Sequence, residues 1–292
     1  MQPGPLSHLA QEIKEAAEHH RGKDYVSDTY LDFFLELSLL HLEEGGGIAD
    51  LEKTRIPDED QAQQRLAEGF FLLDPDHVAV HEDEARKMLG HVAAVYRKYN
   101  PPEAAEADAF EKAADAGRVT GLVLVQHGIH RHEMDFEALG REGGVTRETA
   151  LFFSENLARP ALRSLAALCG DRVLDKQWLK GYCPVCGNWP NLGFHVGEEG
   201  VRLLHCSMCG FVWTFRRLVC PHCDCEEQDR QRYLFTDPKS PYRVDVCNKC
   251  KIYLKTVDLR KDTRSAPLVP WIEDPATLFL DIMANKEGYK RP

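Results

Sequence analysis

Four Cys-x-x-Cys pairs in the second half of this 292-residue chain constrain its fold more than any other feature. The pairs are Cys183/Cys186, Cys206/Cys209, Cys220/Cys223 and Cys247/Cys250. A gap of two residues lets both sulfurs of a pair reach one metal ion, and the backbone N–H groups that follow point at the thiolates. Because one pair supplies only half of a tetrahedral ligand set, each pair needs a second one.

The segments between the pairs follow one plan twice. Between Cys186 and Cys206 the chain reads NLGFHV, GEEG and VRLLHC, which predicts a hairpin that returns the second pair to the first. Between Cys223 and Cys247 it reads QRYLFT, DPKSP and YRVDVC, which predicts a second hairpin with a Pro-rich turn. The strand-like runs FVWTFRRLV and KIYLKTVDL follow the two hairpins. The chain therefore contains an internal repeat.

The repeat predicts which pairs combine into a metal site. Gly187 and Gly210 follow two of the pairs and supply the left-handed backbone that this turn favours, while Asp224 and Lys251 hold these places in the second unit. Because each hairpin returns its second pair to its first, we predict two separate tetrathiolate sites. The first would use Cys183, Cys186, Cys206 and Cys209, and the second Cys220, Cys223, Cys247 and Cys250.

The run FVWTFRRLV joins the two units. Its Phe211, Trp213 and Phe215 alternate onto one face of a strand. Small modules bury too little apolar surface by themselves. We therefore expect this face to cover apolar surface between the two units.

The spacing does not select the metal. Zinc and iron both accept four thiolates in a tetrahedron, and only iron changes oxidation state there. A zinc site would be structural, whereas an iron site could pass one electron.

The composition is that of an ordinary globular protein, with 43% hydrophobic and 28% charged residues. Apolar runs such as LVLV are far shorter than the roughly 20 residues that cross a bilayer, so no membrane span is predicted. The first residues, MQPGPLSHLAQEIKEAAEHH, lack the pattern of an export signal. We expect a cytoplasmic protein, in which clustered cysteines bind metal more often than they form disulfides.

Charge and cysteines are unevenly distributed. Residues 1–180 hold 20 Lys and Arg against 33 Asp and Glu, while residues 181–260 hold 11 against 9. The acidic body argues against a nucleic-acid partner. The shifts in composition predict four parts: a helical domain at 1–175, a first four-cysteine metal module at 176–215, a second at 216–265, and a tail with a short helix at 266–292.

Apolar residues at helical spacing predict helices in the first part. Ser27 or Asp28 is expected to cap SDTYLDFFLELSLLHLEE, and the acidic start and basic end of HEDEARKMLGHVAAVYRKY suit the helix dipole. Thr146 is expected to cap TRETALFFSENLARPALRSLAAL, with a kink or break at Pro160.

The tail is expected to form one helix. Asp274 would cap it, with Pro275 in its first turn. An apolar side that holds the domains together would then consist of Leu278, Phe279, Ile282 and Met283.

Other cysteines and histidines lie outside the predicted sites. Cys225 follows a ligand closely and could replace one or stay a free thiol, but the repeat is complete without it. Cys169 is expected to be a small buried residue at a helix end. His205 and His222 are next to ligands and could join a mixed site, but we expect them at the surface because each unit already has four thiolates.

The segment QHGIHRHEMD gathers more potential ligands. His127, His130, His132 and Glu133 could bind a divalent ion. Their spacing fits no metal-site signature, and a solvated or partner-facing turn is favoured.

The cysteine segments resemble a known family. CPVCGNWPNLGF, LLHCSMCGFVW, VCPHC and VCNKCKIYLKTVDL, in this order after LARPALRSLA, are similar to the formate dehydrogenase accessory proteins of the FdhE family over residues 145–260. The resemblance implies a cytoplasmic factor that contacts the catalytic subunit of bacterial formate dehydrogenases and helps them become active before export. It also implies rubredoxin-like iron, one ion on each predicted set of four cysteines.

We therefore predict an α+β chain, with a helical N-terminal domain and two tandem rubredoxin-like or zinc-ribbon-like modules. The expected function is that of an assembly factor, not an enzyme, with two metal ions of which iron is favoured. The formate dehydrogenase client rests on the resemblance alone, and the oligomeric state stays open.

Two other classes of protein compete with this prediction. A ribbon protein that binds nucleic acid would use Arg216, Arg217, Arg230, Arg232 and Arg243. A thiol oxidoreductase would need a metal-free Cys-x-x-Cys pair with a low thiol pKa.

Overall fold

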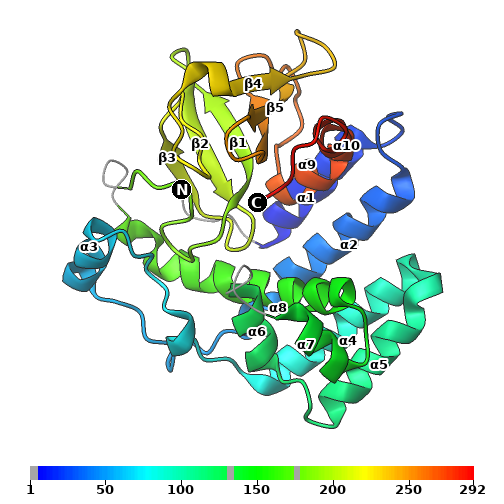
Figure 1. Ribbon diagram of the computed structural model, residues 1–292. Helices are drawn as coiled ribbons and strands as arrows, with labels where there is room; N and C mark the ends of the chain where they lie inside the picture. The colour runs from blue at the N-terminus through cyan, green and yellow to red at the C-terminus, as the bar shows by residue number, and fades with distance from the viewer. Residues whose placement is uncertain (1–5, 130–134, 174–177) are drawn as a thin grey trace.

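The computed structural model describes residues 6–129, 135–173 and 178–292. Helices occupy one part of the molecule and a sheet the other, with two further helices in the tail (Figure 1). The first part contains α1 (Leu6–His20), α2 (Asp28–Glu44), α3 (Glu59–Ala67), α4 (Glu82–Tyr99), α5 (Ala104–Asp115), α6 (Gly121–Ile129), α7 (Phe136–Gly143) and α8 (Arg147–Cys169). The predicted α+β class is confirmed.

The six-stranded sheet follows the helices in the chain. Its strands are β1 (Pro190–Val196), β2 (Val201–Cys206), β3 (Val212–Phe215), β4 (Gln231–Leu234), β5 (Tyr242–Cys247) and β6 (Tyr253–Asp258). The tail helices α9 (Pro270–Ala276) and α10 (Leu278–Lys286) complete the fold.

The caps of two long helices agree with the sequence. Ser27 Oγ accepts a hydrogen bond from the Tyr30 N–H, and Thr146 Oγ1 accepts one from the Thr149 N–H. Both side chains satisfy backbone donors that the first helical turn leaves free.

Helix α8 runs through Pro160 without a break, over 23 residues. Proline has no N–H, so the carbonyl of Asn156 loses its usual donor within the helix. Gly45 packs directly on the proline, since a Cβ at Gly45 would lie 2.2 Å from the Pro160 Cβ. Tertiary contacts thus tolerate a residue that the sequence marks as a helix breaker.

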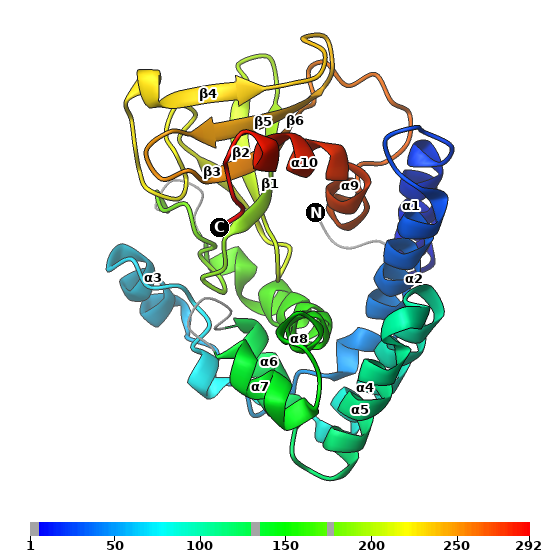
Figure 2. The ribbon, with the colours of Figure 1, turned by 45° about the vertical axis from the view of Figure 1, so that its right-hand side comes forward.

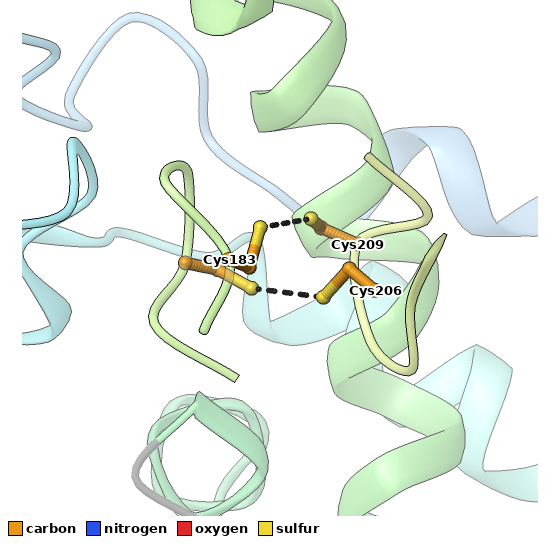
Figure 3. Close-up of side chains that lie close together, drawn as sticks. Cys183, Cys206 and Cys209 are labelled. Carbon is orange, nitrogen blue, oxygen red and sulfur yellow. Dashed lines mark hydrogen bonds between the residues drawn. The ribbon is translucent and has the colours of Figure 1, made fainter. Parts of the chain in front are cut away.

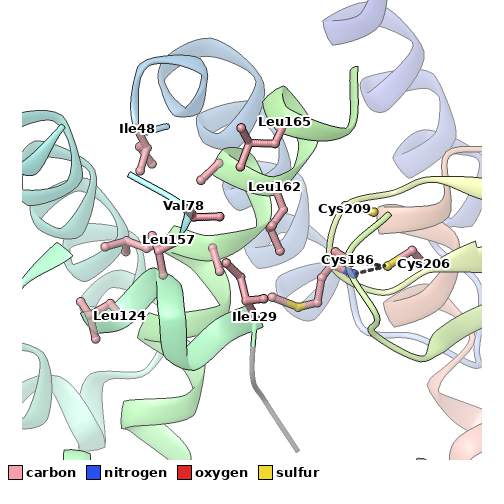
Figure 4. Close-up of a cluster of buried hydrophobic side chains, with 14 of the residues drawn as sticks. Ile48, Val78, Leu124, Ile129, Leu157, Leu162, Leu165, Cys186, Cys206 and Cys209 are labelled. Atoms are coloured by element: carbon pink, nitrogen blue, oxygen red, sulfur yellow. Dashed lines mark hydrogen bonds between the residues drawn. The ribbon is translucent and has the colours of Figure 1, made fainter. Parts of the chain in front are cut away.

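The largest apolar core extends from the helices into the first cysteine module (Figure 4). Leu157, Leu162 and Leu165 of α8 lie in its centre, and Trp213 and Phe215 of β3 belong to it as well. The first module therefore shares its core with the helical part.

The two hairpins form one continuous sheet with the strand order β3-β2-β1-β6-β5-β4. Strands β1 and β6 pair in parallel, with Leu192 opposite Lys255 and His195 opposite Asp258. The other neighbouring strands are antiparallel. The first strand of one unit thus pairs with the last strand of the other, and the units associate head to tail.

The expected place of FVWTFRRLV between the two units is wrong. Strand β3 lies at an edge of the sheet, and Trp213 and Phe215 pack into the helical core, with Phe211 against it. The units meet along the β1–β6 backbone ladder and an apolar cluster that includes Leu192, Phe194 and Val257, whereas β3 packs on the helices.

The expected cap of the tail helix is wrong, and its expected apolar side is confirmed only for Phe279 and Met283, which pack against the apolar cluster of β5 and β6. Asp274 and Pro275 lie inside α9, which begins at Pro270, and the helix is interrupted at Thr277. Leu278 and Ile282 are exposed by 37% and 47%. Asp274 is used in ion pairs instead of capping: its carboxylate lies 2.6 Å from the Lys255 ammonium.

The tail nevertheless connects both parts of the molecule. Helix α9 packs Ile272 and Ala276 against α1 and α2, and α10 packs Leu280 and Ala284 against β5 and β6. Figure 2 shows both helices between the sheet and α1.

A buried carboxylate reinforces this junction. Glu273 is fully buried and accepts hydrogen bonds from Arg264 (2.6 Å) and Tyr242 (2.5 Å). Although burial acts in the opposite direction, His20 and Arg264 lower the pKa of Glu273 to about 2.

Candidate metal centres

The first cysteine cluster joins two turns of the chain. Cys183 and Cys186 lie before β1, and Cys206 and Cys209 lie at the end of β2 and in the next turn. The sulfurs of Cys183 and Cys209 are 3.5 Å apart, as are those of Cys186 and Cys206 (Figure 3). All four sulfurs lie within 4.8 Å of one another.

The second cluster repeats this arrangement. Cys220 and Cys250 have sulfurs 3.8 Å apart, and those of Cys223 and Cys247 are separated by 3.7 Å. These four sulfurs also lie within 4.8 Å of one another. The sulfurs thus lie in the two groups that the spacing predicts.

The spacing of the sulfurs fits one tetrahedral ion in each cluster. A metal–sulfur bond of about 2.3 Å places the sulfurs of a regular tetrahedron about 3.8 Å apart. A disulfide would bring two sulfurs to about 2.05 Å, and all ten cysteines are free. Each cluster could therefore hold one metal ion.

All four Cys-x-x-Cys turns contain the same type of backbone hydrogen bond. In each turn the first cysteine N–H donates to the carbonyl five residues later. The pairs are Cys183 to Asn188, Cys206 to Phe211, Cys220 to Cys225 and Cys247 to Ile252, at 2.9, 2.9, 3.0 and 3.1 Å. Cys225 thus accepts the hydrogen bond that closes a turn with its carbonyl, and its sulfur is not one of the four in the second cluster.

The residue after each pair adopts left-handed backbone. Gly187 and Gly210 have φ of 76° and 74°, and Asp224 and Lys251 have φ of 51° and 61°. In the described part of the chain, these last two are the only non-glycine residues with positive φ. The turn imposes this conformation even on residues that disfavour it.

Hydrogen bonds stabilise the sulfurs of the first cluster. The N–H groups of Val185 and Met208 each lie 3.4 Å from a sulfur, that of Cys183 and that of Cys206. Asn188 Nδ2 donates to the Cys186 sulfur at 3.7 Å. These donors offset the negative charge of thiolates.

Four thiolates cannot share the first cluster without a cation. Burial raises the pKa of Cys183 and Cys209 well above the usual value for a thiol. Burial also opposes ionisation of Cys186, but hydrogen bonds from the other thiols lower its pKa. One buried thiolate is thus stabilised by thiols that stay protonated, and the charge of a metal ion would be needed to stabilise four thiolates.

The second cluster behaves similarly. Burial raises the pKa of Cys220, and that of Cys250 to about 12. In Cys247, N–H groups of the turn overcome the effect of burial and lower the pKa. Here too, a cation would be needed for four thiolates.

The helical part makes direct contacts with the first cluster. Leu72 and Leu73 donate backbone hydrogen bonds to the carbonyls of Pro184 and Val185, at 2.9 and 2.8 Å. Asn188 Nδ2 also donates to the Ile129 carbonyl of α6, at 3.2 Å. Sequence reasoning missed these contacts; the short apolar run at 70–73 was their only signal.

His205 is buried, contrary to its expected surface position. Its Nδ1 lies 2.8 Å from Asn191 Oδ1, and its ring meets the Trp271 ring edge-on. Burial, with a smaller effect of Arg163, lowers the pKa of His205 to about 3. It fills space between β2 and α9, so packing explains the error.

His222 is half-buried and lies against Trp189, with ring centres 4.6 Å apart. This contact links the turn of the first cluster to the turn of the second. Cys169 is fully buried at the end of α8, as predicted.

His127 lies in α6 and its Nδ1 hydrogen-bonds to the Val123 carbonyl at 2.8 Å. His130, His132 and Glu133 lie outside the described residues.

Several arginines proposed for nucleic-acid binding have acidic partners. Arg216 pairs with Asp224 and Glu226. Arg243 pairs with Asp245 at 2.8 Å. These pairs reduce the positive charge available to phosphates.

No helix among the described residues is long and apolar enough to cross a membrane.

Comparisons with known proteins agree with the geometry. The FdhE central domain model matches residues 182–217, and the FdhE C-terminal domain model matches residues 218–292. The "Protein FdhE homolog" of Haemophilus ducreyi is 35% identical over 286 residues, covering 97% of this chain and 85% of that protein. The homolog of Aquifex aeolicus is 34% identical over 153 residues, which span 51% of this chain and 52% of the relative.

A solved structure shares the fold. The crystal structure of the FdhE protein from Pseudomonas aeruginosa superposes with a TM-score of 0.64 at 21% identity, covering 100% of this chain and 95% of that one. With the match over 97% of this chain and 85% of the Haemophilus ducreyi relative, these findings show that the chain belongs to the FdhE family.

Proposed function

We propose that this protein is a cytoplasmic accessory factor that binds the catalytic subunit of formate dehydrogenase and supports its maturation, without catalysing a reaction itself. Membership of the FdhE family supports the client. The observation that carries the accessory role is the match to the Haemophilus ducreyi relative over 97% of this chain, and the pair of four-sulfur clusters supports metal binding.

We further propose that the eight clustered cysteines bind two metal ions, with iron favoured over zinc. When bound, iron in four thiolates would supply a one-electron redox centre. The chain would contribute N–H donors to the sulfurs, a fixed spacing between the clusters, and burial of the first cluster from water.

The visible spectrum and metal content of the purified protein test the metal. Protein from iron-replete cells is expected to absorb strongly in the visible, and elemental analysis should give two iron atoms per chain. Colourless protein with two zinc atoms would rule out the redox part and leave the accessory role to be tested separately.

Co-purification tests the client. The tagged full chain is expected to retain the catalytic subunit of formate dehydrogenase when both are produced in one host. An unrelated protein with a tetrathiolate site serves as control for binding through metal-bound thiolates. If the catalytic subunit binds neither protein, or both equally, the proposed partner is wrong.

Thiol accessibility tests the alternative hypothesis that the protein is a thiol oxidoreductase. The metal-loaded protein is expected to protect the eight clustered cysteines from alkylation, because metal-bound thiolates are poor nucleophiles toward large reagents. Rapid alkylation of one Cys-x-x-Cys pair in the loaded protein would favour thiol exchange over an accessory role.

A further inference from the structure

A cavity of about 70 Å³ lies where the helical part, the first cysteine cluster and the tail meet. Its wall includes residues of α2, α8, β1 and α9, and Ser207 from the turn between Cys206 and Cys209. Because one water molecule needs about 10–15 Å³, the cavity has room for several waters or one small molecule. Polar side chains in its wall include Ser38, His41, Asn156, Arg159 and Arg163.

Arg163 brings a positive charge to this cavity. Its guanidinium carbon lies 3.4 Å from the centre of the Trp271 ring, over its face. A stacked guanidinium uses its face for the contact, so its N–H groups in the plane remain available as donors. Among the described residues, Arg163 Nε is buried and has no hydrogen-bond partner. The stack therefore holds an unused donor group in place.

The other charged groups of the wall are already paired. Arg159 lies 2.5 Å from a carboxylate oxygen of Glu155. Asp274 lies 2.6 Å from the Lys255 ammonium and 2.7 Å from the Arg291 guanidinium. Arg163 itself forms no ion pair with an Asp or Glu side chain among the described residues, and the anionic group that acts on it is the thiolate of Cys209 in the first cluster.

His41 is a second unsatisfied group. It is exposed by only 7%, and its Nε2 has no partner within the described part of the chain. Burial lowers the pKa of His41 well below its usual value, and Arg163 and Arg159 lower it further. The two arginines therefore place positive charge beside His41 in this wall, and an anion between them would offset that charge.

We propose that the cavity binds one small oxyanion, with Arg163 as its main hydrogen-bond donor. A guanidinium offers its donors in a fork that matches two oxygens of a carboxylate, sulfate or phosphate. Its volume of about 70 Å³ matches a small oxyanion rather than a whole nucleotide or peptide. This site is separate from the metal and client proposals and stands without them.

Thermal denaturation of the full-length, metal-loaded protein tests the site. Formate and acetate represent planar oxyanions, sulfate and phosphate tetrahedral ones, and sodium chloride of equal ionic strength is the control. At least one oxyanion is expected to raise the melting temperature along a saturating curve, because a ligand that binds only the folded state stabilises it. The geometry that binds tighter identifies the ligand class. If no oxyanion exceeds chloride, the proposal fails.

A matched pair of variants locates the site. Arg163→Met is expected to weaken the oxyanion effect at least tenfold in apparent affinity, while Arg141→Met, at an exposed position of α7, should keep it. Metal content of both variants is measured alongside. An unchanged oxyanion response in Arg163→Met, with or without loss of metal, would show that the arginine serves the cysteine cluster or the packing instead.

Crystals of the unmodified protein soaked in selenate provide a second test, which does not depend on the folding of a variant. The anomalous signal of selenium is expected beside Trp271, within hydrogen-bonding distance of Arg163. Selenium peaks only elsewhere would contradict the proposed site.

Discussion

The two cysteine clusters have the same backbone turns but different surroundings. The sulfurs of the first cluster belong to the main apolar core, together with α6 and α8. Those of the second form a separate small group with Cys225, and Cys223 and Cys250 are partly exposed. The turn thus sets the ligand geometry locally, whereas the packing around it decides how much of the fold depends on the cluster.

This difference follows from the sheet. The helical part covers the first unit, while the second unit lies on the other side of β1 and is covered mainly by the tail. Four thiols without metal would be left inside the main core at the first cluster. At the second cluster they would be partly hydrated.

The largest expected effect compares one ligand from each cluster. Cys206→Ser should prevent stable folding of the helical part, because a metal site in the core contributes free energy directly to folding. Cys247→Ser should lose one metal equivalent and keep the helices. Circular dichroism and elemental analysis measure both outcomes. A folded Cys206→Ser protein, or helix loss in Cys247→Ser, would break the comparison.

Glu273 tests whether the tail also holds the second unit in place. Its pKa falls from 4.5 to about 2, which corresponds to roughly 3 kcal/mol at about 1.36 kcal/mol per unit. Because the folded pKa is the lower one, this stability is complete above pH 4.5 and is lost as the pH falls toward 2.

Glu273→Gln is therefore expected to lower the free energy of unfolding by ~3 kcal/mol at neutral pH. Near pH 3 the difference from the unmodified protein should shrink by about half. Urea denaturation of both proteins at the two pH values checks this, and metal loss in acid affects both alike. A difference independent of pH would mean that the carboxylate charge is unimportant.

Chelator kinetics sharpen the comparison further. The second cluster should release its metal about tenfold faster, equivalent to ~1.4 kcal/mol in the barrier. Partly exposed Cys223 and Cys250 give a chelator access that the buried first cluster denies. A chromogenic chelator should report two phases, and Cys247→Ser should lack the fast one. Retention of the fast phase in that variant would reverse the assignment.

The smallest expected effect concerns the residue after each pair. Lys251→Gly should stabilise the second unit by ~1 kcal/mol, because left-handed backbone costs an L-residue roughly 1–2 kcal/mol. Gly210→Ala should destabilise the first unit, since its Cβ would lie 2.2 Å from the Trp271 ring. Denaturant midpoints of the two variants should move in opposite directions. Shifts of the same sign would mean that backbone strain does not distinguish the units.

Local patterns in the sequence were informative where the structure is local. The repeat predicts the grouping of the sulfurs, and Ser27 and Thr146 cap the helices as expected. These features depend on neighbouring residues, on the spacing within a turn or on the length of a hairpin.

Contacts between distant segments were not predictable in the same way. The β1–β6 pairing, the burial of His205 and the packing of β3 on the helices each depend on residues far apart in the chain. Pro160 is tolerated where Gly45, far away in the chain, packs on α8. No periodicity within one segment carries that information.

The parallel ladder between β1 and β6 has a consequence for any protein that docks on the sheet. Backbone hydrogen bonds between these strands fix the distance and orientation of the two clusters. A docking protein would therefore meet them as one rigid pair. A one-residue slip of either strand would displace one cluster relative to the other without changing a single cysteine.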